Sequence, residues 1–251
     1  MYIMVQNYQI KHDVVSKDNL SVNDNNINSL RFSNTSTWDL KFLLYLDKDM
    51  LVLPNNWQDK IKLNPPKENN SPETQRELQG MVDLKKSRST TTVENIIKEQ
   101  NLDTTVFGDH PVGDYFDIKK FPKTSALLNP IFGNDLYIVI FTLKNKFDRV
   151  RPSVLEKNIQ PVIDVPQHPA YPSGHSTQMH LLAMILSKLS PRKSTVFENR
   201  ANEIAVHREV AGLHYNSDTL AGELVAKQVM DLLMQNPNFI KLLNEAKSEW
   251  K

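Results

Sequence analysis

The chain has 251 residues, of which 39% are hydrophobic and 24% charged, a composition typical of a globular protein with one sizeable domain. Its 30 basic and 29 acidic residues give a formal net charge of +1, which does not indicate nucleic-acid or membrane-surface binding driven by net charge. The lack of cysteine excludes disulfides, thiolate zinc sites and cysteine nucleophiles.

The N-terminal part is polar. Residues 1 to about 37 are rich in Asn, Ser and Asp, which favour turns, and we interpret residues 1–60 as a partly irregular N-terminal extension. The first residues lack the basic stretch, apolar region and cleavage site of an export signal. No window approaches the roughly 18–20 continuous apolar residues of a membrane span. We therefore expect a soluble, cytoplasmic protein without a membrane span.

An acidic pair follows an apolar run in "FLLYLDKDMLVL", where Asp47 and Asp49 are similar to the DxD loop of magnesium-dependent haloacid-dehalogenase-type phosphatases. Met50 and Leu51 do not match the residues that usually follow that loop. The alternating strand and helix pattern of that fold is also missing. We interpret the two aspartates as the end of a local element.

The compact domain is expected over residues 61–251, after the proline- and asparagine-rich "LNPPKENNSPETQ". Ser71 as N-cap and Pro72 at the first helical position predict a helix there. "TTTVENIIKEQ" predicts a further short helix. One or two helices are expected between residues 124 and 152, although Leu136–Phe141 taken alone could also form a strand.

The C-terminal half has the clearest helical periodicity. Apolar residues recur at three- and four-residue steps in the segments Leu181–Leu189, Phe197–Ala211 and Leu220–Leu233. No internal repeat is apparent. These patterns predict an all-α protein built as a helical bundle.

The first of three polar clusters is Lys144-x6-Arg151-Pro152. Seven residues correspond to about two helical turns, so a continuous helix would present both cations on one face. Pro152 disfavours helix at Arg151, which leaves that guanidinium at a frayed end. A solvated basic helix end would explain this cluster equally well.

The second cluster is Pro172-Ser173-Gly174-His175. Ser173 can cap a helix whose N-terminal amides and dipole attract an anion, and Gly174 lets the backbone approach that anion closely. His175 would then lie where it can donate a proton. An ordinary capped helix with a surface histidine is the alternative.

The third cluster runs from Arg208 to Asp218. Gly212 is expected to end a helix, so that the following turn brings His214 back towards Arg208. Asp218, four residues after His214, is a natural partner for one imidazole nitrogen and would fix its tautomer. A charged helix end followed by an aspartate cap is again the simpler alternative.

All three clusters occur in the order K-x6-R-P, P-S-G-H, R-x5-H-x3-D. The chain therefore resembles the superfamily of type-2 phosphatidic acid phosphatases, class A bacterial non-specific acid phosphatases and vanadium-dependent haloperoxidases, over roughly residues 60–235. This sequence has His207 where the family usually has Ser before the arginine, and it lacks the export signal typical of class A enzymes.

The resemblance implies a metal-independent phosphomonoester hydrolase with the helical fold of that superfamily. It implies that His214 is the nucleophile that forms a phosphohistidine, that Asp218 orients it, and that His175 is the general acid and base. The phosphate would be bound by Lys144, Arg151, Ser173, Gly174 and Arg208. The substrate would be a small phosphomonoester or a lipid-phosphate head group.

No cofactor, metal or nucleic-acid partner is expected, and dimerisation is left open. His168 and His180 flank the second cluster, but nothing in their spacing demands zinc. Tyr171, Tyr215 and Asn216 adjoin the motifs and either shape the pocket or only pack. Two alternatives remain: a haloperoxidase that holds vanadate in the same pocket, and a catalytically silent phosphate-binding module.

Overall fold

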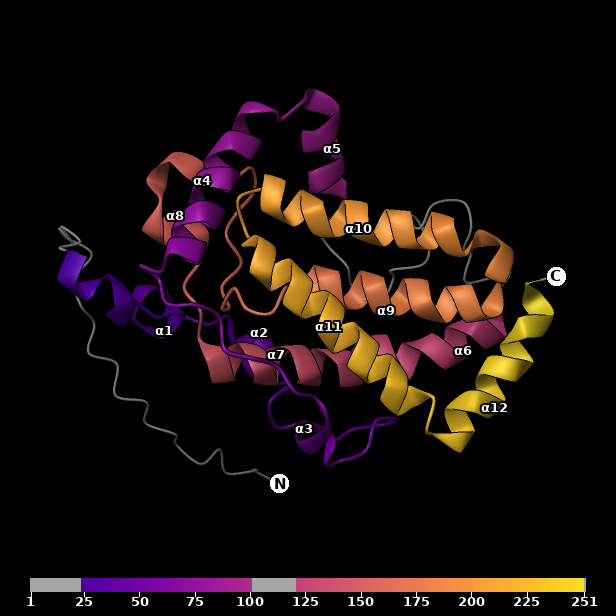
Figure 1. The fold of residues 1–251 in the computed structure, drawn as a ribbon. Helices are drawn as coiled ribbons and strands as arrows, with labels where there is room; N and C mark the ends of the chain where they lie inside the picture. The colour runs from indigo at the N-terminus through magenta and orange to yellow at the C-terminus, as the bar shows by residue number, and fades with distance from the viewer. Residues whose placement is uncertain (1–23, 101–120, 251) are drawn as a thin grey trace, which may run out of the picture.

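A computed structural model of the chain describes residues 24–100 and 121–250. Every regular element in these two ranges is helical, which confirms the expected all-α fold (Figure 1). The α-helices are α1 (Phe32–Thr35), α2 (Leu40–Leu43), α3 (Trp57–Lys60), α4 (Pro72–Lys86), α5 (Thr90–Lys98), α6 (Pro122–Pro130), α7 (Leu136–Phe147), α8 (Pro152–Leu155), α9 (Gly174–Leu189), α10 (Ser194–Val210), α11 (Asn216–Leu233) and α12 (Pro237–Ala246).

Helix α9 lies at the centre of the bundle, where it packs against α10, α11 and α7 (Figure 1). Its apolar residues point to all sides and are buried, including Leu181, Leu182, Ile185 and Leu186. A helix that is apolar all round belongs in a protein interior. The N-terminus of α9, where the second motif lies, is therefore held by neighbours on several sides.

Helices α6 and α7 form one long run that is joined by a π-helical turn, η3 (Ile131–Asp135). The segment Leu136–Phe141 is helical rather than a strand, because it continues this run and packs its apolar side chains into the helical core. A short, continuous apolar run shows neither the period of a helix nor that of a strand, so the sequence alone could not decide between the two.

Contrary to the expectation from the sequence, the run from 122 to 155 is long and apolar enough to cross a membrane by length and composition. Interruptions such as Asn129, Pro130 and Asp135 break the continuous stretch but leave the average hydropathy high. Within the protein, 61% of its most apolar window is buried. Burial of this kind is also found in the core helix of a soluble protein, so the run is weak evidence for a membrane span.

The described part of the N-terminal segment packs on the helical core. Leu53 and Trp57 are buried in the main hydrophobic cluster, and the ring of Phe42 packs against that of Phe141 at a centroid distance of 4.7 Å. The buried Asp135 carboxylate accepts hydrogen bonds from the backbone N–H groups of residues 51, 52 and 53 at 2.7–2.8 Å. These bonds fix the segment beside α7.

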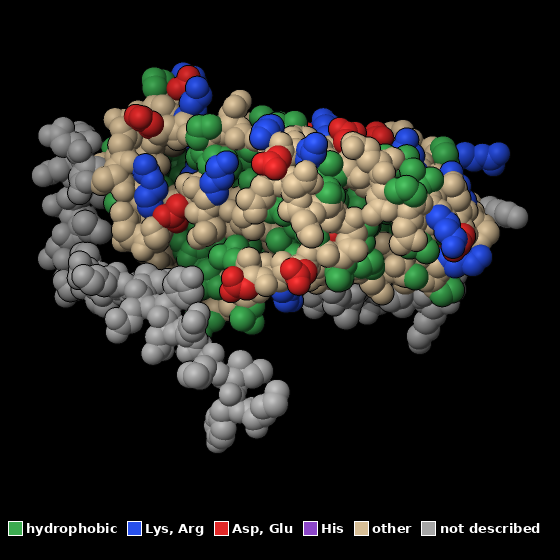
Figure 2. Space-filling view, turned by 90° about the horizontal axis from the view of Figure 1, so that it is seen from below, with side chains coloured by type: hydrophobic (Ala, Val, Ile, Leu, Met, Phe, Trp, Pro, Cys, Tyr) green, Lys and Arg blue, Asp and Glu red, His purple; other side chains and the backbone are tan. Residues whose placement is uncertain are grey.

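The surface carries charges of both signs. Figure 2 shows Lys and Arg side chains scattered among Asp and Glu on one face, with no large patch of a single sign. This distribution agrees with the formal net charge of +1.

Candidate functional site

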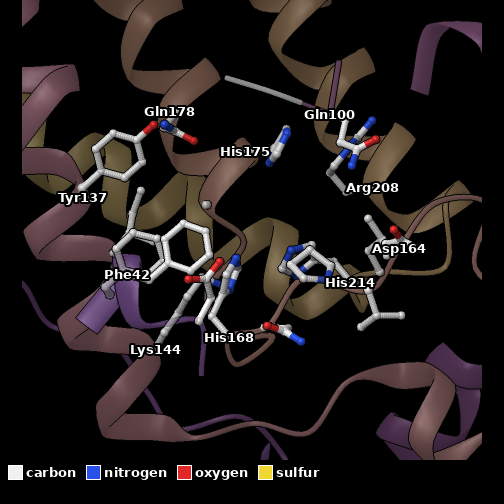
Figure 3. A pocket seen from close by; sticks show the side chains of 18 of the residues that line it. Phe42, Gln100, Tyr137, Lys144, Asp164, His168, His175, Gln178, Arg208 and His214 are labelled. Atoms are coloured by element: carbon white, nitrogen blue, oxygen red, sulfur yellow. The ribbon is translucent and has the colours of Figure 1, made fainter. Parts of the chain in front are cut away.

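A cavity of about 730 Å³ opens where α2, α7, α9 and the turn after α10 meet (Figure 3). Five of the residues that the motifs single out line it: Lys144, Gly174, His175, Arg208 and His214. The rings of Phe42 and Tyr137 form one wall, and Arg208 and Gln100 lie on the opposite side (Figure 3). The structure thus brings residues from all three motifs to a single hollow.

His214 follows the sharp turn at Gly212, whose φ of +83° lies in the left-handed region that favours glycine. Its Nδ1 atom is 3.1 Å from Oδ2 of Asp218, and its Nε2 atom is 3.2 Å from Nη1 of Arg151. A carboxylate only accepts hydrogen bonds, so Nδ1 carries the hydrogen and Nε2 carries the lone pair. The lone pair faces the cations of the site.

The protonation of His214 depends on these surroundings. Burial lowers the pKa of His214 well below its usual 6.5, and the charges of its cationic neighbours lower it further. The charged groups that face the ring are Arg151, Lys144, His175, Arg208 and Asp218. The imidazole is therefore neutral and keeps its lone pair into mildly acidic solution.

Asp218 lies in the first turn of α11 and is fully buried. Besides His214, it accepts a hydrogen bond from the Tyr215 N–H at 3.0 Å and one from Nη1 of Arg149 at 2.6 Å. Both carboxylate oxygens are thus occupied. This geometry fixes the plane of the carboxylate and, through it, the ring of His214.

Lys144 and Arg151 do not share a helical face as a continuous helix would have placed them. Helix α7 ends at Phe147, because Asp148 adopts a left-handed conformation with φ of 46°. Arg151 then follows in extended conformation as the residue before α8. Both side chains still reach the same segment, residues 168–170, to whose carbonyls they donate hydrogen bonds.

Lys144 is fully buried and donates from Nζ to the carbonyls of Pro169 at 2.7 Å and Ala170 at 3.0 Å. Burial lowers the pKa of Lys144 well below 10.5, and the charge of Arg151 lowers it further, while Asp218 acts in the opposite direction. A dianion in the cavity would offset this strain between the two cations.

Arg151 lies behind the cavity wall, where Nε donates to the carbonyl of His168 at 3.0 Å and Nη1 donates to that of Leu213 at 2.9 Å. Its Nη2 atom is 3.0 Å from Nδ1 of His168, which must accept because a guanidinium only donates. Burial lowers the pKa of Arg151 to about 10.

Arg208 projects into the cavity from the end of α10. Its Nη2 atom donates to the carbonyl of Ile96 at 3.1 Å and to Oε2 of Glu99 at 3.3 Å. Its Nε and Nη1 atoms are buried and have no hydrogen-bond partner within the described part of the protein. Buried guanidinium donors are normally satisfied, so two donors without a partner on a side chain that lines the cavity would suit an anionic ligand.

The second motif forms the start of α9. Ser173 is the N-cap, and its Oγ accepts a hydrogen bond from the N–H of Ser176 at 3.3 Å. Ser173 is fully buried and does not line the cavity, whereas Gly174 does. In this structure the hydroxyl of Ser173 therefore caps the helix, and Gly174 forms the surface that an anion would meet.

His175 follows directly and lines the cavity. Its Nε2 atom is 2.9 Å from the backbone carbonyl of Glu99, which can only accept, so Nε2 carries a hydrogen. Glu99 thus contacts both the proposed acid–base residue and Arg208.

Three contributors to the site were not identified as such from the sequence. His168 was noted only as a flanking residue, yet it lines the cavity and binds Arg151; burial and then the charges of Lys144 and Arg151 lower its pKa well below 6.5. Glu99 and Arg149 carry no motif signal at all. Each acts through contacts with residues distant in sequence, which spacing does not report.

Other flanking residues lie away from the cavity. The hydroxyl of Tyr171 donates to the carbonyl of Asn64 at 2.7 Å, Tyr215 is buried beneath Arg149, and Asn216 donates to Glu209. His207, the residue in place of the usual serine, places Nδ1 at 2.7 Å from Oε2 of Glu99.

The aspartates of the rejected DxD interpretation lie in the turn and loop after α2, outside the residues described as lining the cavity. Nor do three or more His, Asp or Glu side chains gather as metal ligands anywhere in residues 24–100 and 121–250.

Comparison with known proteins yields a match of residues 126–237 to the model of the PAP2 superfamily. A non-specific acid phosphatase of Providencia stuartii is 29% identical over 136 residues, which are 53% of this chain and 55% of that protein. One from Salmonella typhimurium is 29% identical over 142 residues, 55% of this chain and 57% of that protein. The chain therefore spans little more than half the length of these curated relatives.

The fold is similar to that in a crystal structure of the first bacterial vanadium-dependent iodoperoxidase. The TM-score is 0.56 at 16% sequence identity, over 86% of this chain and 61% of the other. At this identity the similarity concerns the fold alone.

Proposed function

We propose that this chain belongs to the PAP2 superfamily, whose model matches residues 126–237, and that it hydrolyses phosphomonoesters through a phosphohistidine formed on His214. The observation that carries the proposal is the arrangement of His214. Its Nδ1 atom is held by Asp218 at 3.1 Å, and its Nε2 lone pair faces Arg151 at 3.2 Å in a cavity that is also lined by Lys144 and Arg208. The similarity to acid phosphatases supports the hydrolysis of phosphomonoesters, and the intermediate is argued from the geometry alone.

The proposed first step transfers the phosphoryl group to the enzyme. Lys144, Arg151 and Arg208 balance the charge of the phosphoryl oxygens, and the Nε2 lone pair of His214 forms a bond to phosphorus as the ester P–O bond breaks. The leaving alkoxide takes a proton from His175. Because Nε2 of His175 donates to the backbone carbonyl of Glu99, we assign the proton transfer to Nδ1 of His175.

The second step releases phosphate. His175, now short of one proton, accepts a proton from water while the water oxygen attacks phosphorus and the P–N bond breaks. The electron pair of that bond returns to Nε2 of His214, and His175 is protonated again. Asp218 keeps the hydrogen on Nδ1 throughout, so that the ring enters the next cycle in the same tautomer.

The experiment is turnover of an aryl phosphate by the wild-type protein and by His214→Ala, with and without orthovanadate, followed by alkaline quenching to detect phosphate on the protein. The wild type should hydrolyse the ester, be inhibited by orthovanadate and carry acid-labile phosphate, and His214→Ala should do none of these. His180→Ala is the matched control, because His180 lies on α9 and contacts Ser176 and Asn202 outside the cavity. Undiminished hydrolysis by His214→Ala would refute the assignment.

Chelation separates this site from the magnesium-dependent alternative. Turnover by a histidine nucleophile should be unaffected by EDTA, whereas a haloacid-dehalogenase-type site would lose activity. Binding of inorganic phosphate without any turnover would instead indicate a silent binding module.

The haloperoxidase alternative uses the same cavity. The two open donors of Arg208 and the Nε2 atom of His214 would hold vanadate as they would hold phosphate, and vanadate supplies activation of peroxide when bound. Halide oxidation in the presence of vanadate and peroxide, without phosphatase activity, would reverse the assignment.

A further inference from the structure

We infer that Arg149 and Glu77 are positioning residues that hold Asp218 for the reaction of His214, an inference that rests on the proposed function. Neither is among the residues described as lining the cavity, so both act through Asp218. Four side chains are hydrogen-bonded in a row from the cavity outwards: the imidazole of His214, the carboxylate of Asp218, the guanidinium of Arg149 and the carboxylate of Glu77.

Arg149 is buried behind Asp218. Its Nη1 atom donates to Oδ1 of Asp218 at 2.6 Å and to Oγ of Ser217 at 2.8 Å. Its guanidinium carbon lies 3.6 Å from the ring centroid of Tyr215, so the cation is stacked on an aromatic face. A charge with a side-chain exposure of only 2% is retained where it has fixed partners, and its nearest anion is Asp218.

Glu77 reaches the same place from α4, which is otherwise remote from the cavity. Its Oε2 atom accepts from Nη2 of Arg149 at 3.2 Å, and its carboxylate also accepts from the backbone N–H of Ser217 at 2.5 Å and from the hydroxyl of Ser217 at 3.0 Å. Ser217 and Asp218 are in the first turn of α11. A carboxylate at a helix N-terminus is favoured by the free amides and the dipole.

The two oxygens of the Asp218 carboxylate have different partners. Oδ1 is occupied by Arg149, which leaves Oδ2 to accept from Nδ1 of His214. A buried carboxylate without its guanidinium partner would be an uncompensated charge. Glu77 in turn offsets part of the positive charge of Arg149. The negative charge of Asp218 therefore still stabilises a positive charge on the imidazole of His214.

The two residues should therefore act on His214 in opposite directions. Glu77→Gln leaves Arg149 uncompensated, so Asp218 supports a positive charge on the imidazole less and the pKa of His214 falls. Arg149→Met removes a cation, so the pKa of His214 rises. A residue needed only for folding would not produce shifts of opposite sign.

The experiment measures kcat and KM for an aryl phosphate, and the pKa of His214 by NMR, in Glu77→Gln, Arg149→Met, Arg149→Lys and the double variant Glu77→Gln/Arg149→Met. We expect kcat to fall by roughly 10-fold in Glu77→Gln and by 100-fold or more in Arg149→Met, on the order seen when outer-shell partners are removed, with KM within about twofold. Arg149→Lys should restore part of kcat, and the double variant should show an intermediate pKa.

Matched controls come from the exposed residues of the same helix. Glu73→Gln and Arg76→Lys alter an exposed pair that is 3.9 Å apart and should change neither kcat nor the pKa of His214. Wild-type kcat in both Glu77→Gln and Arg149→Met, or pKa shifts of the same sign, would overturn the inference. If the wild type itself does not turn over, the proposed function fails, and the NMR titration still decides whether these residues act on His214.

Discussion

Nδ1 of His214 lies 3.1 Å from Oδ2 of Asp218, while Oδ1 of the same carboxylate receives a guanidinium of Arg149 at 2.6 Å. The carboxylate can act on the imidazole only as an acceptor. This relationship determines which nitrogen of His214 carries the lone pair and therefore which nitrogen can react.

The first prediction concerns Asp218→Asn, which conserves side-chain volume. The amide oxygen should turn to the guanidinium of Arg149, and the amide NH₂ would then face Nδ1 of His214. Nδ1 must accept, so the hydrogen moves to Nε2 and the reactive lone pair is lost. We expect kcat to fall by a factor on the order of 10⁴, as when the aspartate of a serine protease triad is replaced in this way.

The measurement combines steady-state kinetics with ¹⁵N NMR of the imidazole tautomer. Asp83→Asn on α4 is the control, because Asp83 is exposed and pairs with Lys86 and Gln79 on its own helix. A variant that retains the hydrogen on Nδ1 and most of its kcat would show that Asp218 does not set the tautomer.

The second prediction concerns Arg208, whose Nε and Nη1 atoms have no hydrogen-bond partner among the residues that the structure describes. Arg208→Gln should lower kcat by a factor of about 10²–10³, since removal of one donor to a developing oxyanion typically costs about 3 kcal/mol of transition-state stabilisation. It should also weaken competitive inhibition by inorganic phosphate.

Arg200→Gln distinguishes this role from a general effect on Glu99. Arg200 also pairs with Glu99, at 2.9 Å, but is not among the residues described as lining the cavity. A much smaller loss of kcat is expected for it. Equal losses in the two variants would assign the effect to Glu99 rather than to a contact between Arg208 and phosphate.

Local chemistry explains which features were predictable from the sequence. Ser71 followed by Pro72, and Ser173 before Gly174, begin helices because a hydroxyl satisfies an otherwise unpaired amide within three residues. Gly212 ends a helix because it is free to adopt positive φ. Both signals are complete within a few residues, and so is the His214–Asp218 spacing.

Features formed by distant residues could not be predicted in the same way. Glu77 meets Arg149 across 72 positions, and Phe42 packs against Phe141 across nearly 100. Such contacts depend on how helices cross, and a single sequence carries no period or spacing that reports it. The segment Leu136–Phe141 was ambiguous for a related reason, because packing decides between helix and strand in a short apolar run.

The third prediction concerns stability at acidic pH. Burial lowers the pKa of His168 and His214 well below 6.5, while both have ordinary values in the unfolded chain. Below about pH 6.5 the unfolded state therefore binds more protons than the native state, and the free energy of unfolding falls as the pH falls. The decrease reaches about 1.4 kcal/mol per pH unit for each histidine, and neither contributes above pH 6.5.

Urea unfolding at several pH values between 5 and 7.5 tests this, with His168→Asn as the variant that should have the shallower dependence. Identical slopes in the wild type and His168→Asn would contradict it.

Because a bound dianion opposes the cationic neighbours that lower these pKa values, phosphate binding should take up protons. Calorimetry in two buffers of different ionisation enthalpy measures that uptake directly.

The last prediction concerns the contact between α11 and the start of α9. A Cβ atom on Gly222 would lie 2.6 Å from the backbone carbonyl oxygen of Ser173 and 2.8 Å from Cβ of Ser176. Neither atom is the end of a flexible side chain, so Gly222→Ala must push the two helices apart. We expect a loss of about 1–3 kcal/mol in the free energy of unfolding. We also expect a fall in kcat, because Gly174 and His175 move with the start of α9.

Gly80→Ala is the matched control for the same substitution in a helix. A Cβ at Gly80 meets nothing within 4 Å, so the alanine should stabilise α4 by about 0.5–1 kcal/mol through its helix propensity and leave kcat unchanged. Thermal unfolding and aryl phosphate turnover of both variants separate the two effects. A Gly222→Ala protein that is as stable and active as Gly80→Ala would contradict the prediction. It would mean that α9 and α11 can move apart to make room for the methyl group without a cost in stability and without disturbing the site.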